Sequence, residues 1–148
     1  MVAIWLCERT LAATIAGEMK QTAILVVASL LSVLFFTFHL ADDIVRGFEK
    51  GQAWNLTALA IFAVWLYGAL VIGERRSGHV IVLFASLLGL CAPILHFLGK
   101  GVGLEGRIGG SEGAFFFIWT LIALGVTALL SVILAARGLW SMRRGEER

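Results

Sequence analysis

The sequence predicts an all-α integral membrane protein with four transmembrane helices, and three observations carry that prediction. Of the 148 residues, 59% are hydrophobic and 15% are charged, and the mean hydropathy is +0.92. Four stretches lack Lys, Arg, Asp and Glu, and each is long enough to cross a bilayer as a helix. The apolar runs are continuous rather than alternating, which favours helices over membrane strands. The predicted spans are residues 21–41, 52–73, 78–99 and 114–136.

The first and third spans share a sequence pattern. Residues 28–31 (Ala-Ser-Leu-Leu) recur as residues 85–88, and His39 recurs as His96, always at an offset of 57 positions. The second and fourth spans align less well. The pattern predicts two parallel two-helix repeats, related by a pseudo-two-fold axis along the membrane normal.

The segments outside the spans are short. Residues 1–20 contain apolar side chains before the first span, and we predict a cytoplasmic or interfacial segment there. Residues 137–148 form a basic tail that favours anionic headgroups. The four-helix bundle of residues 21–136 thus occupies most of the chain, and no room is left for a soluble catalytic domain.

Basic residues near the helix ends predict the orientation, because Lys and Arg accumulate on the cytoplasmic side. One end of the bundle would carry eight of them and the other four, so we predict that both termini are cytoplasmic, in a membrane of the bacterial inner-membrane type. The eight are Arg9, Lys20, Arg75, Arg76, Arg137, Arg143, Arg144 and Arg148; the four are Arg46, Lys50, Lys100 and Arg107.

Small and polar residues follow one face of each related helix, at spacings of three, four and seven. Such residues belong at helix contacts or in a protected interior rather than against lipid. The faces are Thr22, Ser29, Ser32, Phe36, His39 and Asp43 in the first span, and His79, Ser86, Gly89, Pro93, His96 and Lys100 around the third.

Parallel repeats would bring His39 and His96 to the same depth near the outer surface. Asp42 and Asp43 follow His39 by three and four residues, which places at least one carboxylate on the histidine's face. We therefore predict an outward-facing polar site made of His39, His96 and Asp43, flanked by Asp42 and Lys100. His79, which follows two arginines in a cytoplasmic turn, is expected at the surface.

Several functions suit these residue types. The site would handle a proton, an ion or a small ligand in a non-enzymatic protein that works as a homo-oligomer or as a subunit. In the alternative, Asp43 and Lys100 form an ion pair and the protein is a structural partner in a membrane complex. In a third interpretation, His39 and His96 bind haem iron or a divalent metal.

Other functions have little support in the sequence. No nucleophile and base stand at a known motif spacing, so we do not expect an enzyme. No basic patch with interleaved aromatic residues points to nucleic acid. The expected partners are the lipid bilayer and other membrane-protein chains.

Overall fold

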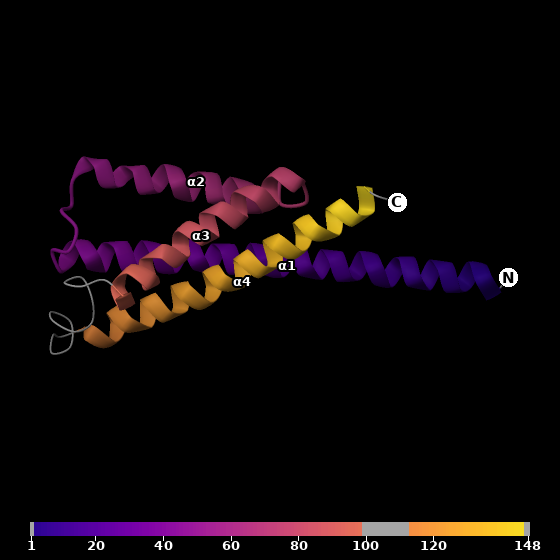
Figure 1. Ribbon diagram of the computed structural model, residues 1–148, viewed down its shortest axis with the longest axis horizontal. Coiled ribbons are helices and arrows are strands. Elements are labelled where there is room, and N and C mark those ends of the chain that lie inside the picture. The colour runs from indigo at the N-terminus through magenta and orange to yellow at the C-terminus, as the bar shows by residue number, and fades with distance from the viewer. Residues whose placement is uncertain (1, 99–112, 147–148) are drawn as a thin grey trace.

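The computed structural model describes residues 2–98 and 113–146, and within them the chain is all-helical. Four α-helices and one 3-10 turn follow one another along the chain (Figure 1). They are α1 (Val2–Val45), η1 (Ala53–Leu56), α2 (Thr57–Leu70), α3 (Arg76–Leu98) and α4 (Ala114–Glu146).

Three of the helices are long and apolar enough to cross a membrane, which supports the predicted membrane location. The candidate spans are Met19–Val45 in α1, Arg76–Leu98 in α3 and Ala114–Gly145 in α4. Large apolar side chains remain exposed along these helices, as expected of surfaces that face lipid. The length and composition of these helices therefore indicate a helical membrane protein.

The second predicted span is shorter than expected. The sequence predicts a helix over residues 52–73, whereas α2 contains 14 residues and ends at Leu70. At its start, the backbone N–H of Gln52 donates to Asn55 Oδ1 at 2.9 Å, and η1 follows. At its end, residues 71–75 form the turn that reverses the chain into α3. Both ends of the predicted span therefore form turns and not α-helix.

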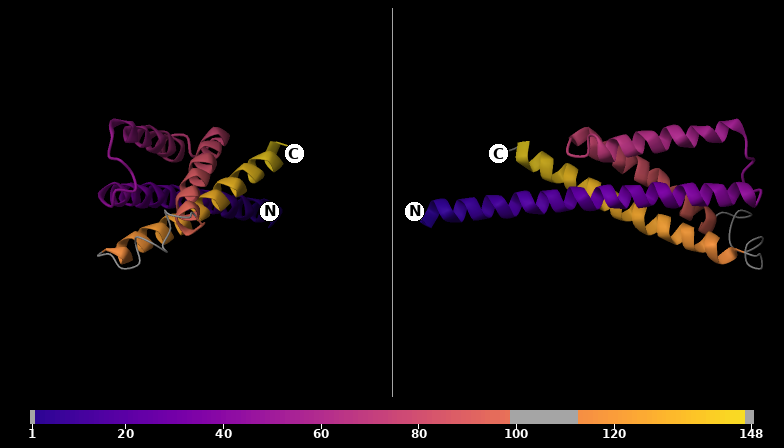
Figure 2. Two further views of the ribbon diagram at one scale, coloured as in Figure 1. Left: turned by 60° about the vertical axis from the view of Figure 1, so that its left-hand side comes forward. Right: turned by 180° about the vertical axis from the view of Figure 1, so that it is seen from behind.

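The start of α1 also differs from the expectation of a separate segment over residues 1–20. The helix is continuous from Val2, and its apolar part begins at Met19. Figure 2 shows α1 extending past the rest of the bundle at its N-terminal end. The start of α1 and the end of α4 lie at the same end of the bundle (Figure 1).

The helices pack unequally. α4 packs against both α1 and α3, whereas α2 lies at the edge and contacts α3 and α1. One buried cluster surrounds Trp65 and joins residues of all four helices, and a second surrounds Phe117 near the start of α4. The first cluster consists of Leu25, Trp65, Ala69, Val82, Leu134 and Ala135.

Some hydroxyl side chains in these helices bond to their own backbone. Ser32 Oγ donates to the carbonyl of Ala28 at 2.8 Å, and Ser131 Oγ donates to the carbonyl of Thr127 at 3.0 Å. Such bonds to the preceding turn satisfy a polar group where no water is available. The inward positions predicted for Ser32 and its neighbours are confirmed, because Ser29, Ser32 and Ser86 are fully buried.

Glycines close the hairpin between α2 and α3. A Cβ at Gly78 would overlap the carbonyl group of Ile72, and a Cβ at Gly68 would lie 2.6 Å from Ile81 Cγ2. The two helices can therefore approach only because neither position carries a side chain.

We expect Gly78→Ala to destabilise this hairpin by about 1–3 kcal/mol, because the clash is with backbone, which cannot rotate away. Unfolding of the detergent-solubilised protein by a denaturing detergent measures the change. Gly17→Ala is the matched control, since a Cβ at Gly17 meets nothing within 4 Å. Equal stability of the two variants would contradict this account of the hairpin.

Candidate metal site

Two histidines and one aspartate meet near the end of the bundle where α1 and α3 end and α4 begins. His39 and Asp43 lie one turn apart on α1, and His96 lies near the end of α3. All three side chains are buried, with 1%, 7% and 6% of the surface of His39, Asp43 and His96 exposed. The structure thus brings together three residues predicted as one site.

The carboxylate of Asp43 lies between the two imidazoles. Its Oδ2 atom is 3.4 Å from His39 Nε2 and also 3.4 Å from His96 Nε2. The imidazole rings are perpendicular, with centroids 4.8 Å apart. One potential ligand atom from each residue can be chosen so that all three lie within 4.8 Å of one another.

Polar atoms in this cluster lack hydrogen-bond partners among the described residues. Neither ring nitrogen of His39 has one, and neither has Asp43 Oδ1. At 3.4 Å, the contacts with Asp43 Oδ2 are longer than the usual 2.9–3.0 Å of an N–H···O bond. Buried polar groups are normally bonded, so unmet bonding capacity in a buried cluster suggests that it holds a further species.

The end of α1 shapes this cluster through a glycine turn. Gly47 has a φ of +74°, which places it in the left-handed region favoured by glycine. The N–H of Phe48 donates to the carbonyl of Asp43 at 2.9 Å, and the N–H of Gly47 donates to that of Ile44 at 3.1 Å. This pair of bonds is a Schellman motif. It turns the chain back so that Phe48 packs over the site.

Aromatic rings form the walls of the site. The Phe117 ring centroid lies 5.0 Å from that of His39 and 5.1 Å from that of His96. Phe48 contacts both Phe117 and His96, with centroids 6.1 and 6.3 Å away. The imidazoles therefore lie in an apolar environment in which an electrostatic interaction is strong.

Asp42 does not join the two histidines. Its Oδ2 atom accepts a hydrogen bond from Arg46 Nε at 2.7 Å, one turn further along the chain. The Arg46 guanidinium also lies over Phe117, 5.5 Å from the ring centroid. Of the two neighbouring aspartates, Asp43 thus lies in the site, whereas Asp42 holds Arg46 beside it. Lys100, the other predicted flanking residue, lies outside the described residues.

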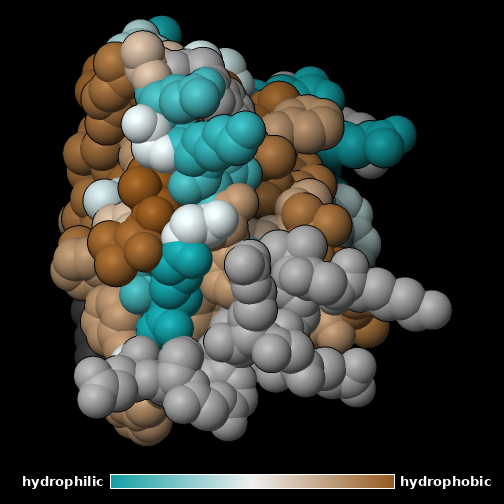
Figure 3. All heavy atoms as spheres, turned by 90° about the vertical axis from the view of Figure 1, so that its left-hand side faces the viewer, coloured by the Kyte–Doolittle hydropathy of each residue, from teal (hydrophilic) through white to brown (hydrophobic). Residues whose placement is uncertain are grey.

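Figure 3 looks onto this end of the bundle. Described hydrophilic residues form a band across the face, with hydrophobic residues on both sides of it. The buried cluster thus lies beneath an end of the molecule where polar groups gather.

His79 is not at the surface, contrary to the sequence-based expectation. Only 4% of its surface is exposed, and Nδ1 lies 3.2 Å from the carbonyl oxygen of Arg75. The ring fits against α4 because residue 138 is glycine; a Cβ there would overlap Nε2. The reason for the error is that this glycine contact joins residues 59 positions apart in the sequence.

Sequence reasoning also missed Phe48, Phe117 and Arg46 as parts of the site. Gly47, two residues after the end of α1, was the available signal for a turn that reverses Phe48 onto the bundle. Comparison with protein families, with curated proteins and with solved structures gives no match for this chain.

Proposed function

We propose that this membrane protein binds one divalent transition-metal ion, with zinc as the best candidate, through His39, His96 and Asp43. The observation that carries the proposal is the position of Asp43 Oδ2, which is 3.4 Å from Nε2 of both histidines. Ligand atoms about 2.0–2.1 Å from a tetrahedral zinc ion lie about 3.4 Å from one another. The distances from Asp43 Oδ2 to the two histidine nitrogens therefore match the spacing of ligand atoms around zinc.

The chemistry of the three ligands supports the same ion. Neutral imidazole and carboxylate are common zinc ligands, and imidazole also suits copper, nickel and iron. One carboxylate neutralises half of the charge of a divalent ion, which reduces the cost of burying it. Neither Ca²⁺ nor Mg²⁺ is favoured, because both prefer oxygen ligands only.

A haem fits this arrangement poorly. Haem ligation would require the two imidazoles to face each other across a porphyrin plane. Their ring centroids are instead 4.8 Å apart, at an interplanar angle of 90°, and Phe117 lies against both rings. We therefore propose a single small ion and not a bis-histidine haem.

The role of the ion is proposed to be binding or handling rather than catalysis. The site lies near the end of the spans, where an ion can enter from the aqueous side, and its ligands come from two different helices. An oligomer or a larger membrane complex would supply the surface for a translocation path that one small bundle lacks. We also propose that both termini are cytoplasmic and that the chain contains two related two-helix repeats.

The competing candidate is a structural role, in which Asp43 links the two histidines and thereby joins α1 to α3. The observation that favours it is that both contacts of Asp43 fall within ion-pair distance when an imidazole is protonated. A proton-handling site would use the same contacts.

Zinc titration of the purified protein distinguishes these candidates. We expect His39→Ala and His96→Ala each to weaken zinc binding by about 100-fold or more, because loss of a second-shell partner alone costs 10–100-fold. A competition assay with a zinc-binding dye measures the affinity. Helical content from circular dichroism checks that each variant is folded. Unchanged zinc affinity in both folded variants would defeat the proposal.

A further inference from the structure

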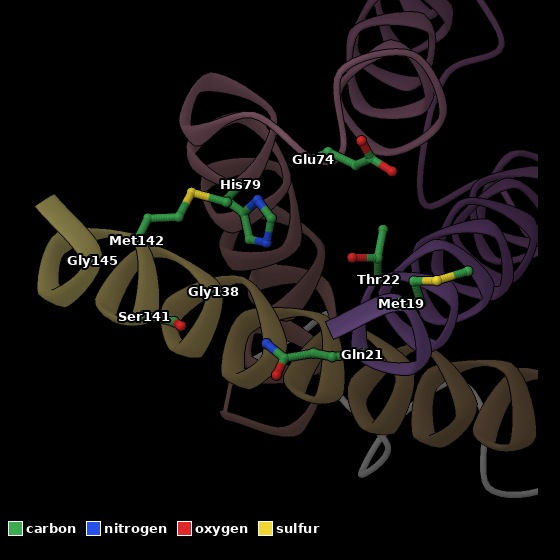
Figure 4. A pocket seen from close by; sticks show the side chains of 9 residues that line it. All are labelled: Met19, Gln21, Thr22, Glu74, His79, Gly138, Ser141, Met142 and Gly145. Carbon is green, nitrogen blue, oxygen red and sulfur yellow. The ribbon is translucent and has the colours of Figure 1, made fainter. Parts of the chain in front are cut away.

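A second polar feature lies at the other end of the bundle. A cavity of about 480 Å³ opens there between α1, the turn before α3 and the last turns of α4 (Figure 4). The candidate spans begin or end at this level, at Met19, Arg76 and Gly145. The lining residues are Met19, Gln21, Thr22, Glu74, His79, Gly138, Ser141, Met142 and Gly145.

The imidazole of His79 is buried in the wall of this cavity. His79 Nδ1 lies 3.2 Å from the carbonyl oxygen of Arg75, and a carbonyl only accepts. Nδ1 therefore donates a hydrogen bond to this carbonyl. Nε2 packs against Gly138, which is itself part of the cavity wall.

Other lining residues offer acceptors. The Gln21 side chain uses Nε2 to donate to the carbonyl of Leu134 at 3.4 Å, which leaves Oε1 as an acceptor. Figure 4 shows the Glu74 carboxylate above the Thr22 side chain, with the His79 imidazole across from both. Acceptors from α1 and from the turn before α3 thus line one cavity, and its described lining contains neither lysine nor arginine.

We propose that this cavity binds a protonated primary amine. An ammonium group has three donors and no acceptor, which complements this set of acceptors. The Glu74 carboxylate supplies the opposite charge and a charge-assisted hydrogen bond. Met19 and Met142 offer polarizable apolar walls for the methylene groups next to the amine. The inference is independent of the metal site at the other end.

Two sources could supply the ammonium group, namely the headgroup of an aminophospholipid and a free small amine such as ethanolamine. The lipid is the favoured source, because the cavity lies at the level of the helix ends. Exposed basic residues next to the lining positions would attract the phosphate of the same headgroup. They are Lys20, Arg75 and Arg137.

Native mass spectrometry of the detergent-solubilised protein tests the proposal. The protein is mixed with equal amounts of phosphatidylethanolamine and phosphatidylcholine that carry the same acyl chains. We expect the wild type to retain the ethanolamine lipid roughly tenfold better, because the trimethylated headgroup has no N–H donor. Glu74→Gln should lose this preference, whereas Glu49→Gln, a carboxylate change at the other end of the bundle, should keep it.

Free ethanolamine distinguishes the two sources of the amine. Displacement of the lipid by ethanolamine, or binding of ethanolamine without lipid preference, would support the cavity as an amine site and identify the free amine as a ligand. Equal retention of both lipids together with no ethanolamine binding would overturn the proposal. A lipid preference that persists in Glu74→Gln would overturn it as well. None of these results depends on zinc.

Discussion

Asp43→Asn is expected to abolish zinc binding, with affinity reduced by about 100-fold or more. The carboxylate contributes the only negative charge in the ligand set and the only oxygen that lies 3.4 Å from both imidazoles. An amide of the same size keeps the packing but provides a neutral, weaker ligand. Isothermal titration with zinc, in detergent, measures the change directly.

Asp42→Asn is the matched control for this prediction. Asp42 directly precedes Asp43 in the sequence, and its carboxylate bonds to Arg46 instead of the histidines. We expect zinc affinity within about threefold of the wild type, a change of about 0.7 kcal/mol, because Asp42 pairs with Arg46 and is not a ligand. If Asp42→Asn and Asp43→Asn lost zinc binding equally, the assignment of Asp43 as the ligand would be wrong.

Trp65→Ala is expected to destabilise the protein by about 3–5 kcal/mol. The Trp65 side chain is fully buried in the cluster that joins all four helices. Its ring fills the space above Gly89, where an added Cβ would lie 3.1 Å from the ring. Removal of the indole would leave a cavity at the place where α2 attaches to the bundle.

Denaturing-detergent titration followed by circular dichroism measures this loss of stability. Trp119→Ala is the control, since Trp119 is 53% exposed and its truncation removes no comparable core contact. A Trp65 variant as stable as the Trp119 variant would show that α2 is not held by this cluster.

The sequence alone identified the three residues that the structure brings together, but not the residues around them or the lengths of the helices. His39, Asp43 and His96 were found because a 57-residue offset and helical periodicity place them on inward faces at one depth. Periodicity could not choose between Asp42 and Asp43, which both stand near the histidine's face. The choice depends on Arg46, which bonds to Asp42 one turn later.

Helix lengths were predicted less well, because hydropathy does not mark where a hairpin closes. Residues 71–73 are apolar or small and extend the predicted span, yet the chain turns there. The turn is possible because of Gly73 and Gly78, whose backbones approach their neighbours closely. The buried position of His79 was missed for a related reason, since it depends on Gly138 of another helix.

The two polar features at opposite ends of the bundle suit different ligands. At one end, two imidazoles and a carboxylate surround a point suited to a small ion, in an apolar environment. At the other end, acceptors line an open cavity suited to a donor-rich cation. Between them lies the packed cluster around Trp65, which separates the two sites.

Elemental analysis of the zinc-treated, desalted protein tests the central claim most directly. The account predicts about one zinc ion per chain in the wild type, and almost none in folded Asp43→Asn, as expected for a site with three protein ligands. A wild-type protein that retains no zinc, copper, nickel or iron, or an Asp43→Asn variant that retains as much metal as the wild type, would contradict it.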